Sequence, residues 1–199
     1  MLEVRQLSCA RGERTLFSHI SFSLNPGEWL HVQGGNGAGK TSLLRQLVGL
    51  AARESGDILW DGQSTHSADF RADVLYLGHH AAVKEDLSPL ENLGLANALD
   101  GLAIDHDGAL RALARLGLRG REHLPVRVLS AGQKRRVLVA RLLVRPVRLW
   151  VLDETFNALD ADAADLLGNL VSEHLGSGGM AVLTSHQPLP LAGGKTLAL

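Results

Sequence analysis

A glycine-rich segment, residues 34–41 (GGNGAGKT), has the composition and spacing needed to bind phosphate. It fits the pattern G-x-x-x-x-G-K-[ST] without mismatch, between a predicted strand at 28–32 and a predicted helix at 40–50. Without side chains, successive backbone N–H groups can converge on phosphate oxygens at the positive end of a helix. A chance glycine-rich turn is the alternative, and the flanking strand and helix disfavour it. The sequence therefore predicts a nucleotide-binding protein.

The residues of this loop have expected roles. Lys40 is expected to reach the β- and γ-phosphates, and the Thr41 hydroxyl is expected to bind Mg²⁺. The predicted phosphate-binding residues are Gly34, Gly35, Asn36, Gly37, Ala38, Gly39, Lys40, Thr41 and Ser42.

An apolar run that ends in two carboxylates, residues 149–154 (LWVLDE), is the second chemical feature. It is typical of a buried strand with Asp153 and Glu154 at its carboxyl end, where ligands bind in open parallel sheets. We expect Asp153 to hold Mg²⁺ through water and Glu154 to polarise the attacking water as general base. Such a pair is also common in solvated turns. The phosphate loop upstream favours the catalytic interpretation.

A third segment, residues 129–133 (LSAGQ), precedes a basic helix start at 134–136. Ser130 suits a helix N-cap, and the N–H groups behind it form a second phosphate-binding end. With the two earlier motifs, this segment resembles the L-S-G-G-Q signature of ABC-transporter ATPase subunits. The resemblance implies that ATP and Mg²⁺ are bound, and that the signature of one subunit contacts the γ-phosphate of ATP held by the other. The implied residues are Ser130, Ala131 (in place of the usual glycine), Gly132 and Gln133.

The resemblance continues in the family's order and covers essentially the whole chain. Residues 158–160 (ALD) look like the loop that contacts the partner's phosphate loop, which implies a nucleotide-site role for Asp160. Residues 184–186 (TSH) resemble the switch segment whose histidine, here His186, contacts the γ-phosphate. A lone histidine is more often structural, but this one follows the last core strand. The catalytic residues implied are Glu154, His186 and Lys40.

Besides Ala131, two departures from the family pattern bear on the nucleotide site. His79 stands where the family usually has glutamine, and an imidazole can still orient a Mg²⁺-bound water, in a manner that depends on pH. The pair His79 and His80 is alternatively a metal or haem site, although neighbours on an extended segment point in opposite directions. The aromatic residue that normally stacks on adenine is missing. Arg11 can stack there through its guanidinium plane, or it is only a solvated turn residue.

Segments 7–17, 37–45, 76–79 and 129–133 together resemble one subfamily, the ATP-binding subunits of the cytochrome c maturation system, or haem exporter ATPases. The resemblance implies a head-to-tail homodimer on integral membrane subunits, at the cytoplasmic face of the bacterial inner membrane. ATP hydrolysis is then expected to drive haem export, or release of a haem-loaded chaperone, without haem contact by this chain. Segment 80–91 is expected to contact the membrane subunits, or else is a solvated loop. The alternatives are the ATPase of another ABC exporter and a soluble ABC ATPase acting on DNA, RNA or ribosomes.

Composition limits the possible functions. With 20 Lys and Arg against 21 Asp and Glu, the formal net charge is −1, which argues against a nucleic-acid partner. An apolar content of 45% in 199 residues is enough for a core and excludes disorder. A single cysteine, Cys9, excludes an internal disulfide. Because we find no secretory signal and no run of about 18 apolar residues, we expect any membrane connection to run through a partner.

Strands alternating with helices must position these motifs. The predicted strands are 2–7, 20–24, 28–32, 57–60, 73–77, 148–152, 180–184 and 196–199, and the predicted helices are 40–50, 131–144 and 160–175. The first two strands predict an antiparallel layer, and the others predict a mostly parallel α/β sheet. Leucines at helical spacing between about 85 and 130 predict an inserted helical subdomain. We thus expect one ABC ATPase domain over residues 1–199, with a P-loop NTPase fold.

Overall fold

The computed structural model describes residues 1–78, 83–157 and 159–199. The chain divides into two compact units. The core unit comprises Met1–Gly78, Val147–Asn157 and Gly168–Leu199, and the helical unit comprises His79–Pro146 and Ala158–Leu167. Among the described residues, no helix has the length and apolar character needed to cross a membrane.

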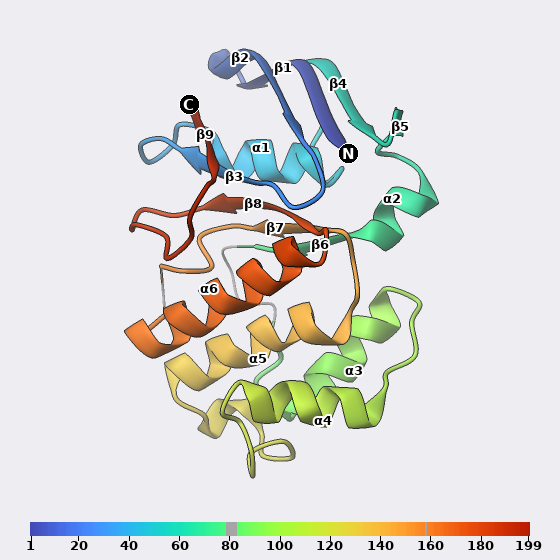
Figure 1. Cartoon of the computed structure of the whole chain (residues 1–199), viewed down its shortest axis with the longest axis vertical. Helices are drawn as coiled ribbons and strands as arrows, with labels where there is room; N and C mark the ends of the chain where they lie inside the picture. The colour runs from blue at the N-terminus through green and yellow to red at the C-terminus, as the bar shows by residue number, and fades with distance from the viewer. Residues whose placement is uncertain (79–82, 158) are drawn as a thin grey trace. The chain divides into compact units, whose positions relative to one another are not determined.

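A five-stranded parallel sheet forms the centre of the core unit (Figure 1). In spatial order its strands are β6 (Val74–Leu77), β7 (Leu149–Leu152), β8 (Met180–Thr184), β3 (Trp29–Gln33) and β9 (Lys195–Ala198). Every residue of β7 and β8 is buried, which explains their uninterrupted apolar sequences. Because β7, β8 and β3 are parallel neighbours, the segments that follow them leave the sheet at the same edge.

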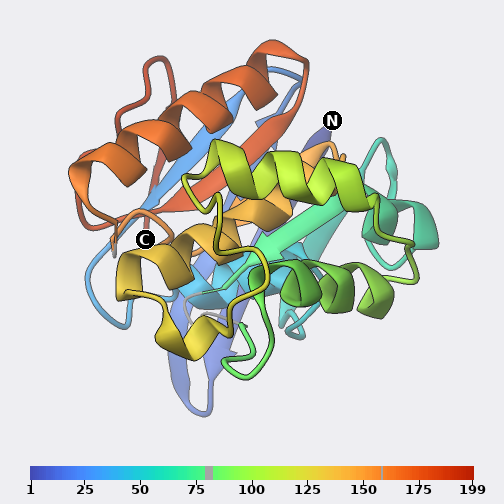
Figure 2. The same ribbon diagram turned by 90° about the horizontal axis from the view of Figure 1, so that it is seen from below.

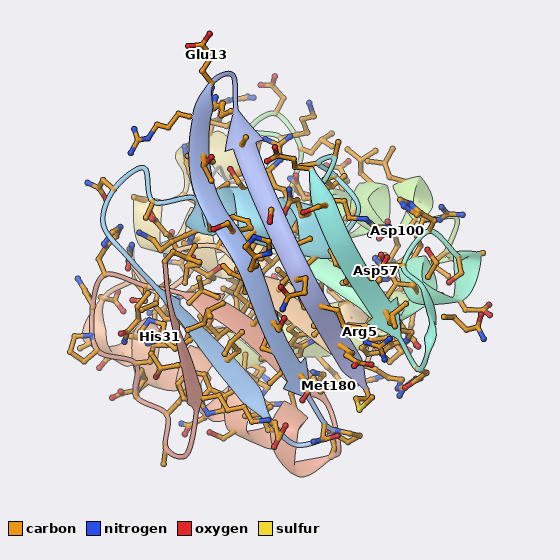
Figure 3. All side chains as sticks on the ribbon, turned by 90° about the horizontal axis from the view of Figure 1, so that it is seen from above. Arg5, Glu13, His31, Asp57, Asp100 and Met180 are labelled. Atoms are coloured by element: carbon orange, nitrogen blue, oxygen red, sulfur yellow. The ribbon has the colours of Figure 1, made fainter. Side chains whose placement is uncertain are left out.

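An antiparallel sheet forms the second layer of the core unit. Its strands lie in the order β2 (Arg14–Leu24), β1 (Leu2–Arg11), β4 (Ser55–Trp60) and β5 (Gln63–Ser64). Figure 3 shows the long β1–β2 hairpin with Glu13 at its tip, and the register partners Arg5 and Asp57 on β1 and β4. The hairpin strands are longer than the predicted strands at 2–7 and 20–24. Gln6 and His19 have positive φ, at 47° and 53°, and the register shifts along this ladder, so the alternation used for the prediction is interrupted.

Helix α1 (Lys40–Leu47) packs into the apolar core shared by the two sheets. Leu43, Leu44 and Leu47 are fully buried. The helix ends three residues before the predicted end, and Leu50 is 57% exposed. A short helix, α2 (Ala68–Asp73), was not predicted; Ser67 caps it and Phe70 is its single buried residue.

The helical unit contains α3 (Pro89–Leu99), α4 (His106–Arg115), a 3₁₀ turn η1 (Val126–Val128) and α5 (Ala131–Val144). Helices α3, α4 and α5 pack against one another (Figure 2), through buried leucines such as Leu93, Leu113 and Leu138. Helix α6 (Ala161–Gly176) begins in this unit and ends in the core unit. The predicted α/β fold with an N-terminal antiparallel layer is confirmed, as are helices within the 85–130 segment.

Candidate active site

The phosphate loop lies where the sequence predicts it, between β3 and α1. Gly39 occupies the N-cap of α1 with φ 106°, and a Cβ atom there would lie 3.0 Å from Phe17 Cδ1 and 3.1 Å from Leu16 Cβ. Only glycine therefore fits this position without strain. Among the described residues no side chain caps α1, so its first N–H groups remain available to an anion.

Lys40 is held inside this loop. Its side chain is 6% exposed, and Nζ donates to the carbonyl oxygens of Gly34 at 2.7 Å and Gly35 at 3.2 Å. The loop thus places an ammonium group beside the backbone N–H groups at the start of α1. Such an arrangement suits the charge and oxygen-rich surface of a polyphosphate.

A cavity of about 340 Å³ opens over the loop. Its lining residues are Arg11, Arg14, Leu16, Gly35, Asn36, Gly37, Gly39, Lys40, Thr41, Ser42 and Glu154. Of the predicted loop residues, Gly34 and Ala38 do not line it. Arg11, for which base stacking was predicted, does line it. Arg14 and Leu16 were not predicted as site residues. Arg14 pairs directly with Arg11 in the hairpin, so a turn predicted at residues 12–13 would have indicated Arg14.

Asp153 follows β7 and is completely buried. Thr184 Oγ1 donates to Asp153 Oδ1 at 2.8 Å, and the Tyr76 hydroxyl donates to Oδ2 at 3.4 Å. Burial, with the nearby Asp153 carboxylate, raises the pKa of Tyr76 to about 12, so the phenol remains a neutral donor at pH 7. No role was predicted for Tyr76 or Thr184, because their contacts depend on which strands are neighbours.

Glu154 links the cavity to His186. Its φ is 52°, a strained region for a non-glycine residue, and its N–H donates to Thr184 Oγ1 at 2.8 Å. Its carboxylate Oε1 accepts a hydrogen bond from His186 Nε2 at 3.0 Å. His186 does not line the phosphate-loop cavity; it lines a separate cavity of about 570 Å³ that also contains His31 and Gly34. The structure therefore brings together Glu154 and His186, which are distant in sequence.

The signature segment opens α5 within the helical unit. Gln133 N donates to Ser130 Oγ at 3.2 Å, and Ser130 N donates to Gln133 Oε1 at 3.1 Å, so the two residues form a capping box. The N–H groups of Ala131 and Gly132 belong to the first turn, which has no intrahelical acceptors. Ser130 is thus the helix N-cap, as the sequence predicts.

Asp160 lies beside this helix start. Its Oδ1 accepts the N–H of Ala163 at 2.8 Å, so Asp160 caps α6, and it lies 3.6 Å from Arg136 Nη2. A Cβ atom on Gly132 would lie 3.6 Å from Asp160 Oδ2. This proximity within one chain was not predicted from the sequence. The predictions made for His79 lie outside the described residues.

The motif order and the strand–loop–helix geometry define an ATP-binding protein of the P-loop type, and comparison with known proteins gives its family. The sequence profile of the ABC transporter family matches residues 17–157. The chain belongs to this family, and it is an ABC-type ATPase.

Solved structures of other ATP-binding proteins have the same fold. An ABC transporter ATP-binding protein from Pyrococcus furiosus gives a TM-score of 0.86 at 24% identity over 100% of this chain and 96% of that one. An ATP-binding subunit of an ABC transporter gives 0.82 at 26% identity over 94% and 79%.

The more similar relatives share one description, "Cytochrome c biogenesis ATP-binding export protein CcmA". The protein of Dechloromonas aromatica is 53% identical over 100% of this chain and 98% of its own length. That of Nitrosomonas europaea is 50% identical over 96% and 91%. That of Escherichia coli K12 is 47% identical over 98% and 93%.

Proposed function

We propose that this chain is the ATP-hydrolysing subunit of an ABC transporter complex that powers haem export, or release of a haem-loaded chaperone, for c-type cytochrome biogenesis. The observation that carries the catalytic part is the Glu154–His186 hydrogen bond of 3.0 Å at a cavity lined by the phosphate loop. The haem part is supported by relatives that are about half identical over nearly the whole chain and are named for cytochrome c biogenesis.

The residues of the core unit divide the reaction among them. Lys40 and the N–H groups of the loop bind the β- and γ-phosphates and stabilise the charge that develops there. Water attacks the γ-phosphorus, its proton passes to the Glu154 carboxylate, and the bond to the β-phosphate oxygen breaks to release ADP. His186 orients that carboxylate, and its ring is proposed to contact the γ-phosphate. Arg11 and Arg14, which line the cavity, are proposed to contact the base.

The donor set of the site fits Mg²⁺. Thr41 offers a hydroxyl and Asp153 a carboxylate that Thr184 and Tyr76 hold in place, and Mg²⁺ prefers such oxygen ligands together with water and substrate phosphates. When bound, the ion would neutralise charge on the β- and γ-phosphate oxygens. His79 is proposed as a further group that orients a metal-bound water.

A second copy of the chain completes each ATP site. Ser130, Gly132 and the other signature residues sit at the start of α5, where N–H groups and the helix dipole favour an anion. We propose that this end binds the γ-phosphate of ATP held by the partner in a head-to-tail homodimer, with Asp160 at the contact. Hydrogen-bond donors supplied by the partner would increase the rate of hydrolysis most if they bind the charge that develops on the γ-phosphate oxygens in the transition state.

Membrane subunits are proposed to dock on the helical unit, which would hold the chain at the cytoplasmic face of the bacterial inner membrane. A groove of about 430 Å³ there supports this proposal. It is lined by Val83, Lys84, Asn92, Leu95, Ala96, Leu99, Asp100 and Arg141. Leu99 is 79% exposed, and large apolar side chains exposed at a groove are typical of protein contacts. Neither nucleic acid nor haem is proposed to contact this chain.

One depletion experiment tests the function. Cells depleted of this chain should lose covalently haem-bearing cytochromes c and keep other haem proteins, and the wild-type chain should restore the cytochromes c.

The Glu154→Gln variant should bind ATP and accumulate as a dimer, yet restore no cytochromes c, because the general base is removed. Normal cytochromes c after depletion would favour another ABC exporter, and undiminished ATP hydrolysis by Glu154→Gln would contradict the catalytic assignment. Recovery of the chain in the soluble fraction, with membrane partners present, would favour a soluble ABC ATPase.

A further inference from the structure

A short turn of the core unit contacts His186 with both of its ends. Asn157 N donates to the carbonyl oxygen of Glu154 at 3.1 Å, which closes the turn. Between these residues Thr155 is fully buried and Phe156 is 3% exposed, so the turn is anchored in the protein interior. Its first residue, Glu154, meets the imidazole of His186, and its last residue, Asn157, meets the backbone of the same histidine.

The contact by Asn157 is specific in its chemistry. Its Oδ1 accepts a hydrogen bond from His186 N at 3.2 Å and lies 3.1 Å from Ser185 Oγ, whose one proton also has the Gln187 carbonyl oxygen as an acceptor at 2.9 Å. Because a backbone N–H can only donate, the amide oxygen and not the amide nitrogen must face this segment. Ser185 Oγ also accepts the N–H of Gln187 at 3.0 Å. Residues 185–187, here named the switch turn, are therefore tied together and to Asn157.

We propose that Asn157 is a positioning residue that sets the distance between the Glu154 carboxylate and the His186 ring. The inference rests on the proposed function, in which that pair acts on ATP. Both members of the pair are attached to the same closed turn, one through its own backbone and the other through Asn157 Oδ1. Without this acceptor, the switch turn loses its fixed relation to Glu154, and small displacements of catalytic groups reduce rates strongly.

A second contact limits the size of the expected effect. On the β3 side, His31 Nε2 lies 3.4 Å from the carbonyl oxygen of Ser185, and Gln33 Nε2 donates to His31 Nδ1 at 3.1 Å. The Gln33 bond leaves the proton on Nε2, so His31 donates to the switch turn. This contact remains when Asn157 is changed, so turnover should fall without being abolished.

Three variants of the full chain test the proposal in steady-state ATP hydrolysis. Asn157→Leu removes the acceptor at similar volume and should lower kcat about tenfold, or up to about a hundredfold, with KM for ATP within about twofold of wild type. Asn157→Asp keeps an acceptor oxygen toward both donors and should restore kcat to within about threefold. Thr155→Val is the matched control from the same turn: among the described residues its buried hydroxyl has no hydrogen-bond partner, so kcat should not change.

Ser185→Ala provides a second measurement in case Asn157→Leu unfolds. It removes one of the two donors and should give a smaller loss of kcat than Asn157→Leu, again at unchanged KM. Wild-type kcat in Asn157→Leu, an equal loss in Asn157→Asp, or a matching loss in Thr155→Val would each overturn the proposal. If the wild-type chain hydrolyses ATP and Glu154→Gln does not, such a result refutes only the role of Asn157. An inactive wild-type chain would instead refute the proposed function.

Discussion

The two helix starts that carry the predicted phosphate-binding motifs are built in opposite ways. Helix α1 follows Gly39, whose left-handed backbone offers no side chain to the first turn. Helix α5 follows Ser130, which forms a complete capping box with Gln133. The first helix start therefore depends on a ligand for its N–H partners, while the second already satisfies two donors within the chain. A phosphate at α5 must use the remaining N–H groups of Ala131 and Gly132, which suits a site completed by ATP bound elsewhere.

Substitutions at Ser130 should have the largest effect, and they test whether the start of α5 binds phosphate. Ser130→Asp keeps an N-cap acceptor but places a negative charge where a γ-phosphate is proposed to bind. Hydrolysis should fall about a hundredfold or more, the usual effect of losing an oxyanion-type donor, while ATP affinity and thermal stability stay near wild type. Ser130→Ala separates the two roles, because it should also lower stability by about 1 kcal/mol through the lost cap. If Ser130→Asp hydrolysed ATP normally, α5 would be only a capped helix.

Mixing variants tests whether α5 acts on the ATP of its partner. Homodimers of Lys40→Ala and of Ser130→Asp should each be nearly inactive. A mixed dimer has one site with both changes and one site with neither. Random mixing of equal amounts should therefore recover up to about a quarter of wild-type hydrolysis, since half of the dimers are mixed and each has one intact site. No recovery would place both residues in the same site of one chain.

The Lys40→Ala variant addresses the other helix start. Hydrogen bonds to charged groups contribute about 1.5–3 kcal/mol, so ATP affinity should fall roughly 10- to 100-fold in a calorimetric titration. Lys195→Ala is the matched control, because Lys195 pairs with Glu28 away from the phosphate loop. Its affinity for ATP should equal that of wild type. Equal affinities for Lys40→Ala and wild type would show that the uncapped helix start binds phosphate without the ammonium.

Features encoded in consecutive residues could be predicted from the sequence, and contacts between distant segments could not. Both helix starts are encoded in a few consecutive residues, so their motifs and the elements around them were found from the sequence. Asp153, Glu154 and His186 were predicted as site residues in the same way, each from its position after a predicted strand. That β7, β8 and β3 are neighbours could not be derived, because strand order in a parallel sheet is not chain order. The contacts that depend on this order were missed for the same reason.

The predicted lengths of the first two strands were too short for a different physical reason. Alternation predicts a strand only while successive side chains point to opposite faces. Gln6 and His19 break that pattern with positive φ, so the prediction stopped the first strand at Leu7 and began the second at Ile20. Helix α2 has six residues and one buried side chain, Phe70, which is too little for a helical period to be recognised.

The C-terminal end of α6 is a third helix terminus, and a substitution there should have the smallest effect of those predicted. A protonated histidine there would be favoured by the helix dipole. His174 is instead half-buried, stacked on Trp150 with ring centroids 3.9 Å apart, and its Nε2 lies 3.2 Å from the Met180 carbonyl. Burial lowers the pKa of His174 below its usual 6.5, outweighing the backbone hydrogen bonds that raise it.

The sign of the resulting pH dependence follows from this lowered pKa. Above about pH 6.5 the unfolded and folded chains are both neutral at His174, and its contribution to stability is complete. As pH falls through 6.5 toward the lower folded pKa, the unfolded chain takes up a proton that the folded chain does not, so the free energy of unfolding decreases. Urea denaturation between about pH 8 and pH 5.5 should show this decrease, and His174→Phe should make it smaller. The same substitution at the exposed His66 should leave it unchanged. An unaltered slope in His174→Phe would mean that helix α6 tolerates the charge and that its dipole offsets the cost of burial.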